Sequence, residues 1–147
     1  MNKTKKQNIK KIYELVDQFN HPIIKDIENK YEIDLRQRLL KFAVDTLKLL
    51  MKLPNKREFD VIKYQLSKSA TSVGANFEEA QSSSDKEFVQ KLRIALREAN
   101  ESNYWYKIID ELKVLDTDEH KRLSKESQEI GLILGSIVSK LNKKIYR

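Results

Sequence analysis

Cysteine is absent from the 147 residues, and glycine and proline are scarce, with three and two copies. Without cysteine the chain has no disulfides and no thiolate ligands for a metal. So few turn-forming residues favour a handful of long helices over many short strands. No apolar run approaches the length that spans a bilayer, and no signal-peptide segment follows the basic start of the chain. These absences predict a cytoplasmic, mainly helical protein without a membrane partner.

The charge of the chain is unevenly distributed. The net charge is +7, from 29 Lys and Arg against 22 Asp and Glu. Residues 1–11 and 140–147 contain basic residues and no acidic ones, so the positive excess lies at the two ends. Basic arms of this kind attract the phosphate backbones of nucleic acids. The alternative interpretation is that the two ends are simply solvated termini. The basic residues of the two ends are Lys3, Lys5, Lys6, Lys10, Lys11, Lys140, Lys143, Lys144 and Arg147.

Four stretches of helical apolar periodicity fill residues 34–147. Pro54 ends the first stretch, and the third is expected to reach about Leu115. Short connections between long helices favour antiparallel neighbours. We therefore predict an all-α domain, an up-down-up-down antiparallel four-helix bundle. The candidate start signals of its helices are Asp34, Asn55, Ser84 with the capping-box residue Glu87, and Asp116.

Residues 1–33 are predicted to be a separate, short helical N-terminal extension. The dipeptide His21-Pro22 divides this segment into two short amphipathic stretches. The extension is expected to pack on the bundle or on a neighbouring subunit. The apolar residues of its two stretches are Ile9, Ile12, Val16 and Phe19, then Ile23, Ile24, Ile27 and Tyr31.

No pattern of residues indicates catalysis. A di-iron site in a four-helix bundle needs Glu-x-x-His pairs, and neither His21 nor His120 has a Glu three residues before it. The chain contains no G-x-S-x-G turn and no glycine-rich phosphate loop. We therefore predict a protein that is not an enzyme and that uses no metal or cofactor.

Polar residues interrupt the apolar stripes of the second and third helices. Helical spacing places two of them on one face of the second helix and three on one face of the third. We predict one polar-aromatic cluster between the helices, with a structural role. Its members are Asn76, Glu79, Glu98, Glu101 and Trp105. The glycines Gly74, Gly131 and Gly135 fall inside predicted helices, where they indicate close helix packing.

The third helix has two wide apolar faces. A single neighbouring helix of the bundle cannot cover both of them. This favours a homo-oligomer whose interface includes the second and third helices. The alternative is a monomer with a thick core that the N-terminal extension helps to cover.

The segment from Gln65 to Ala80, QLSKSATSVGANFEEA, resembles a known bacterial four-helix bundle family. That family was first named for proteins encoded in intervening sequences of large-subunit ribosomal RNA genes. The match continues through SDKEF at 84–88, KLRIALREA at 91–99 and ESNYW at 101–105, and covers roughly residues 34–144. The resemblance implies a ring-like homopentamer. The family is also similar to the accessory protein of diversity-generating retroelements, a basic pentameric barrel that binds the reverse transcriptase and nucleic acid.

Two functions follow as hypotheses. The first is a non-catalytic oligomeric accessory protein that binds structured RNA or a ribonucleoprotein. Its contacts would come from the basic ends and from Lys86, Arg93 and Arg97, which share a helical face. No alternation of aromatic and basic residues marks a base-stacking platform. The alternative is a structural or protein-interaction ring with no nucleic-acid role, which the near-neutral residues 12–139 favour.

Overall fold

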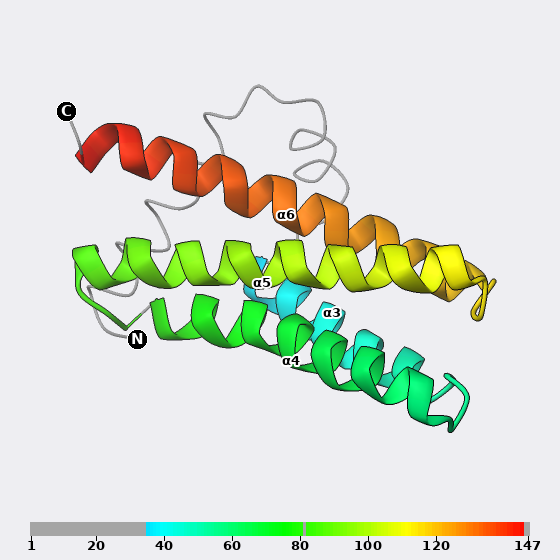
Figure 1. Ribbon diagram of the computed structural model, residues 1–147. Coiled ribbons are helices and arrows are strands. Elements are labelled where there is room, and N and C mark those ends of the chain that lie inside the picture. The colour runs from blue at the N-terminus through cyan, green and yellow to red at the C-terminus, as the bar shows by residue number, and fades with distance from the viewer. Residues whose placement is uncertain (1–34, 81, 146–147) are drawn as a thin grey trace.

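The computed structural model describes the backbone of residues 35–80 and 82–145, with their side chains except those of residues 85, 140 and 143–145. Four helices make up this part of the chain (Figure 1): α3 (Leu35–Leu50), α4 (Arg57–Ala80), α5 (Asp85–Leu112) and α6 (Asp118–Ile145). No strand occurs among the described residues. The predicted N-terminal extension, residues 1–33, lies outside them.

The four helices are antiparallel neighbours. On α4 and α5, Ser102 Oγ donates to Ser69 Oγ at 2.9 Å, and Lys91 pairs with Glu79. The residue numbers of these two contacts run in opposite directions along the two helices. α3 packs against α4 and α6, and α5 packs against α4 and α6, so each helix has two neighbours. This confirms the predicted up-down-up-down bundle.

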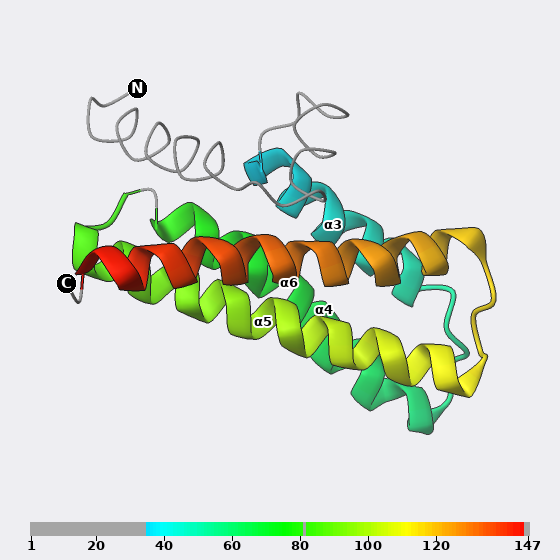
Figure 2. The same cartoon turned by 90° about the horizontal axis from the view of Figure 1, so that it is seen from above.

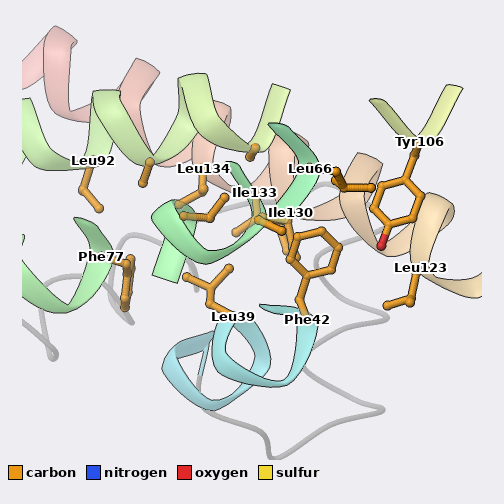
Figure 3. Packing of buried hydrophobic residues seen from close by; sticks show 14 of the residues in the cluster. Leu39, Phe42, Leu66, Phe77, Leu92, Tyr106, Leu123, Ile130, Ile133 and Leu134 are labelled. Carbon is orange, nitrogen blue, oxygen red and sulfur yellow. The ribbon is translucent and has the colours of Figure 1, made fainter. Parts of the chain in front are cut away.

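One continuous core joins all four helices. Leucines from each helix are fully buried in it, and Figure 3 shows side chains from different helices pointing into the same interior. Tyr106 is the largest fully buried side chain, and its hydroxyl lies 2.8 Å from that of Thr46. Burial raises the pKa of the Tyr106 phenol well above its ordinary value, despite the hydrogen bond with Thr46 that acts to lower it. The phenol therefore stays neutral.

The start of α5 follows the prediction. Ser84 is the N-cap residue, its hydroxyl accepts from the backbone N–H of Glu87, and the Glu87 carboxylate accepts from the backbone N–H of Ser84. This reciprocal pair is the predicted capping box. The corresponding prediction for Asp34 lies outside the described residues.

The turn between α5 and α6 differs from the prediction. Lys113 adopts a left-handed conformation with φ 52°, so α5 ends at Leu112, before the predicted end near Leu115. Thr117, and not Asp116, caps α6, because the Thr117 hydroxyl accepts from the backbone N–H of His120 at 3.1 Å. The Asp116 carboxylate is instead paired with Lys121.

Candidate nucleic-acid and assembly surfaces

The outward side of α5, with the adjoining side of α6, is rich in basic side chains. Lys86, Arg93 and Arg97 are seven and then four residues apart, so they follow one side of the helix, as the sequence predicted. Tyr104 and Lys107 continue the same spacing towards the end of α5, where the acidic residue Glu111 follows. We call this surface the outer α5–α6 face and define it by Lys86, Arg93, Arg97, Tyr104, Lys107 and, on α6, Lys125.

Helix pairing places Lys125 on this face. Ser124 donates to Asp110 at 3.1 Å, and Gly131 packs against Asn100. The antiparallel register that these contacts set brings Lys125 to the level of Lys107 on α5. The two lysines are exposed and far apart in the sequence, so only the packing of α5 on α6 brings them together.

The cations of this face make no ion pair among the described residues. Lys86, Arg97, Lys107 and Lys125 are exposed, whereas Arg93 donates to the neutral amide oxygen of Asn142 at 2.5 Å. A cation without a carboxylate partner keeps its charge available for an external anion. The outer α5–α6 face therefore presents net positive charge, although the middle of the chain is close to neutral.

Several acidic residues of the bundle pair with cations on the α3 side. Arg38 of α3 binds Glu126 at 2.5 and 2.8 Å and Glu129 at 2.7 Å. Burial acts to lower the pKa of Arg38, but its two carboxylate partners outweigh burial and raise it. Arg122 binds Asp45 at 2.8 Å along the same seam. Charges on this side neutralise one another, so these carboxylates are not available to neutralise the cations of the outer α5–α6 face.

Tyr104 gives the outer α5–α6 face an aromatic ring. Its side chain is 59% exposed and packs edge-on against Trp105, with ring centroids 5.5 Å apart. Tyr104 lies between Arg97 and Lys107 along the helix. An exposed ring beside cations suits stacking of an unpaired base. Tyr104 was not among the residues predicted from the sequence, although its seven-residue spacing from Arg97 was a detectable signal.

Most side chains of the two basic ends are not among those that the structure describes. Lys3, Lys5, Lys6, Lys10, Lys11 and Arg147 lie outside the described residues. Lys140, Lys143 and Lys144 belong to the last turns of α6, but only their backbone is described. Their part in nucleic-acid contact remains a prediction.

The five residues predicted to form one polar-aromatic cluster divide into separate groups. Trp105 donates its indole N–H to Glu101 at 3.4 Å, and Glu98 lies close enough to Glu101 to feel its charge. On α4, the Asn76 amide donates to a carbonyl oxygen of its own helix, and the exposed Glu79 pairs with Lys91. The contacts thus join the three α5 residues and give each α4 residue a different partner.

Glu98 is the member of the α5 group whose carboxylate is least favourably surrounded. One of its carboxylate oxygens is buried without a hydrogen-bond partner among the described residues. Burial, and secondarily the charge of Glu101, raises the pKa of Glu98 above its ordinary value. Ionising this carboxyl in the folded protein is therefore unfavourable.

Replacing this carboxyl by an amide is expected to stabilise the protein at neutral pH. The pKa of Glu98 is higher in the folded than in the unfolded protein. The free energy of unfolding is therefore not reduced by this group at low pH, where the carboxyl is protonated, and it falls as the pH rises through the folded pKa. The variant Glu98→Gln should raise the free energy of unfolding at about pH 7 and change it little at about pH 3.5. Urea denaturation at both pH values measures this, with the exposed Glu111→Gln as control. An equal response of the two variants would contradict the assignment.

An apolar strip runs along the other flank of α5, beside α4. Ile94, Trp105 and Ile108 are half-buried on this flank, and Leu112 is exposed at its end. The antiparallel pairing through Ser69 and Ser102 brings the exposed Val61 of α4 to the same end. We call Val61, Ile94, Trp105, Ile108 and Leu112 the α4–α5 strip. An apolar surface left at the edge of a core is typical of subunit contacts.

A serine, a histidine and an aspartate meet near the start of α6, but not in a catalytic order. Ser124 donates to Asp110 at 3.1 Å, and His120 Nε2 lies 3.3 Å from the other oxygen of Asp110. A nucleophilic serine must instead bond to the histidine that takes its proton. His120 is buried, and its ring lies tilted by 36° against that of Tyr106, with centroids 5.9 Å apart. The hydrogen bond between Ser124 and Asp110 therefore joins α5 to α6.

Other chemistries find no support in the described part of the chain. It holds no group of His, Cys, Asp and Glu arranged to bind a metal ion. None of its helices is long and apolar enough to cross a membrane.

The three glycines lie at helix contacts. A Cβ at Gly74 would stand 3.7 Å from Leu39 Cβ on α3, and one at Gly135 would stand 3.7 Å from Leu96 on α5. At Gly131 the nearest atom, Asn100 Oδ1, would be only 3.2 Å away. Gly131 is thus the tightest of the three positions, and Gly74 is the one that faces backbone atoms of a neighbouring helix.

The comparisons with known proteins agree with this architecture. Residues 31–136 match the family model of the 23S rRNA-intervening sequence protein. A similar solved structure is a crystal structure of a protein with unknown function from the S23 ribosomal protein family of Bacteroides thetaiotaomicron VPI-5482. It shares 34% sequence identity and a TM-score of 0.65, over 71% of this chain and 98% of that chain. No curated protein matches the chain.

The family match covers well over half of the chain and includes α3, α4, α5 and most of α6. The residues that carried the resemblance in the sequence, from Gln65 to Trp105, fall within this range. The chain belongs to the 23S rRNA-intervening sequence protein family.

Proposed function

We propose that this chain is a non-catalytic accessory protein that binds the phosphate backbone of structured RNA through its outer α5–α6 face. The observation that supports this is a set of cations, most of them exposed, that have no acidic partner among the described residues and that surround the exposed ring of Tyr104. Phosphate contacts supply sequence-independent affinity, and the ring offers a stacking surface for an unpaired base. The name of the family refers to ribosomal RNA, which is consistent with an RNA partner.

We further propose that the protein acts as a homo-oligomer, with five subunits favoured, whose interface includes the α4–α5 strip. This strip and the outer α5–α6 face lie on different flanks of α5, so subunit contact leaves the basic face accessible. Repetition of the basic face and of the basic ends in each subunit would add weak contacts through avidity.

A binding titration of the full chain against structured RNA at two salt concentrations tests the RNA proposal. We expect measurable binding at about 50 mM salt and much weaker binding at about 200 mM. Deleting residues 1–11 should weaken binding and flatten its salt dependence, because five lysines are removed. If the full chain is not retained even at the lower salt, the RNA proposal is wrong.

The second candidate function is a structural or protein-interaction ring without a nucleic-acid role. The α4–α5 strip favours it, because exposed and half-buried apolar side chains beside α4 offer area for protein contacts. This candidate predicts assembly without RNA binding, so the same titration separates the two.

Assembly itself can be tested with matched leucines. Light scattering should give about five times the 17.4 kDa of one chain. Leu112 and Leu132 are almost equally exposed, at 53% and 54%, but only Leu112 belongs to the α4–α5 strip. Leu112→Asp should therefore lower the mass at a given concentration, and Leu132→Asp should not. A monomer mass for the unaltered chain at micromolar concentration would exclude this assembly.

A further inference from the structure

The outer side of α3 carries an apolar stripe that nothing in the described part of the chain covers. Leu40, Val44 and Leu47 of α3 are followed by Met51, one residue past the end of the helix. The four are four, three and four residues apart, so their side chains follow one side of the helix. Their exposed fractions are 65, 40, 39 and 78%. These four residues are the α3 stripe. Single exposed apolar residues are ordinary. Four of them along one side of a helix indicate a face that packs against a further segment or another molecule.

The α3 stripe runs along the α4 side of α3. Arg36 stands one turn before Leu40 on the same side, and it pairs with Glu78 of α4. The adjoining side of α4 carries Ser67 and Thr71. The Ser67 hydroxyl donates to the Tyr64 carbonyl, and the Thr71 hydroxyl donates to the Ser67 carbonyl. These hydroxyl protons are satisfied within their own helix and need no water. The surface beside α3 is thus suited to an apolar partner.

We propose that residues 23–31 of this same chain cover the α3 stripe as a short helix antiparallel to α3. The apolar members of this segment are Ile23, Ile24, Ile27 and Tyr31, at spacings that put them on one side of a helix. The remaining residues, Lys25, Asp26, Glu28, Asn29 and Lys30, are polar and would face water. One apolar face would thus meet another, and the α3 stripe has no cover among the described residues.

Chain connectivity favours this occupant over a separate molecule. The first described residue, Leu35, is five positions before Leu40, so the segment leaves the bundle at the head of the α3 stripe. A short connection between helices favours antiparallel neighbours, which would return the segment along α3. At about 1.5 Å per helical residue, the stripe spans roughly 16 Å and residues 23–31 span roughly 12 Å.

The segment mostly precedes the part of the chain shared with the family. The family model begins at residue 31, and the solved relative covers 71% of this chain. The inference therefore concerns this chain's own N-terminal residues, and it does not depend on RNA binding or on the α4–α5 strip.

Disulfide trapping tests this contact, because the chain has no cysteine of its own. In the full chain, the pair Ile27→Cys with Val44→Cys places one thiol on each apolar face. The matched control, Asn29→Cys with Val44→Cys, has almost the same sequence separation but puts the first thiol on the polar face. A disulfide needs Cα atoms about 4.4–6.8 Å apart. With oxidised glutathione as oxidant, we expect the Ile27 pair to close within one chain at least about ten times faster than the control.

The result is read on a non-reducing denaturing gel and by thermal unfolding of the reduced variants. Faster intrachain closure of the Ile27 pair supports the proposal. Equal rates for the two pairs would mean that the segment does not dock in register, and the proposal would fall. Disulfides that join two chains would assign the α3 stripe to a second copy and would also overturn it. Both reduced variants carry the same Val44→Cys change, so any shift of the unfolding temperature that it causes is common to the two and leaves the comparison of closure rates intact.

Discussion

The double variant Arg97→Glu/Lys107→Glu is expected to bind structured RNA roughly 50-fold more weakly than the unaltered chain at about 0.1 M salt. Each cation that neutralises a phosphate releases a counterion, so removing two such contacts lowers the affinity by about that factor. The dependence of log affinity on log salt should also flatten, by about 1.4 to 1.8 per binding subunit. Filter binding over a salt series measures both quantities.

The control keeps the change of net charge and moves it to another surface. Lys48 and Lys56 are exposed, make no ion pair among the described residues, and lie on or beside α3, away from the outer α5–α6 face. Lys48→Glu/Lys56→Glu should reduce the affinity only slightly, through the long-range field. If this control weakens binding as much as the first variant, net charge alone governs binding and the outer α5–α6 face is not the site.

Gly74 is a position where a small and a large side chain should change the stability of the fold in opposite directions. A Cβ at Gly74 would meet Leu39 at an ordinary van der Waals distance of 3.7 Å, with the Leu39 carbonyl carbon and oxygen at 3.8 Å. Gly74→Ala therefore fits, and it should raise the free energy of unfolding by up to about 1 kcal/mol because alanine favours the helix. Gly74→Leu must push α4 away from α3, at a cost of about 1–3 kcal/mol.

Urea denaturation of the two variants against the unaltered chain measures this reversal of sign. The unfolding free energy should rise with alanine and fall with leucine. A leucine variant as stable as the alanine variant would show that α3 moves aside freely. The close approach of α3 to α4 would then have no structural role.

The helices were predictable because their signals are local. Apolar spacing is repeated within a few turns, and Ser84 and Glu87 are neighbours in sequence, so the capping box needs no tertiary information. The start of α6 was less accurately predicted because Asp116 and Thr117 are adjacent candidates. The structure pairs Asp116 with Lys121 and leaves Thr117 as the cap.

The candidate site was predicted in part. The face shared by Lys86, Arg93 and Arg97 follows from spacing on one helix. Lys125 could not be added, because its neighbour Lys107 is on another helix and the register of α5 on α6 is set by Ser124 and Asp110. Helical spacing led us to predict one cluster that contained both Asn76 and Glu98. Spacing places a residue on a face of its own helix, but it does not determine which residue of another helix a polar group contacts.

The sequence by itself determined the fold class, the number of helices in the bundle, and their approximate ends. These depend on interactions between residues a few positions apart, which periodicity and capping residues record. Only the tertiary structure decided which charges cancel. Arg38 meets Glu126 across 88 residues of chain, and Arg122 meets Asp45 across 77. Coulomb interactions depend on distance in space and not on composition, so a chain with a near-neutral middle presents a basic face on α5 and α6.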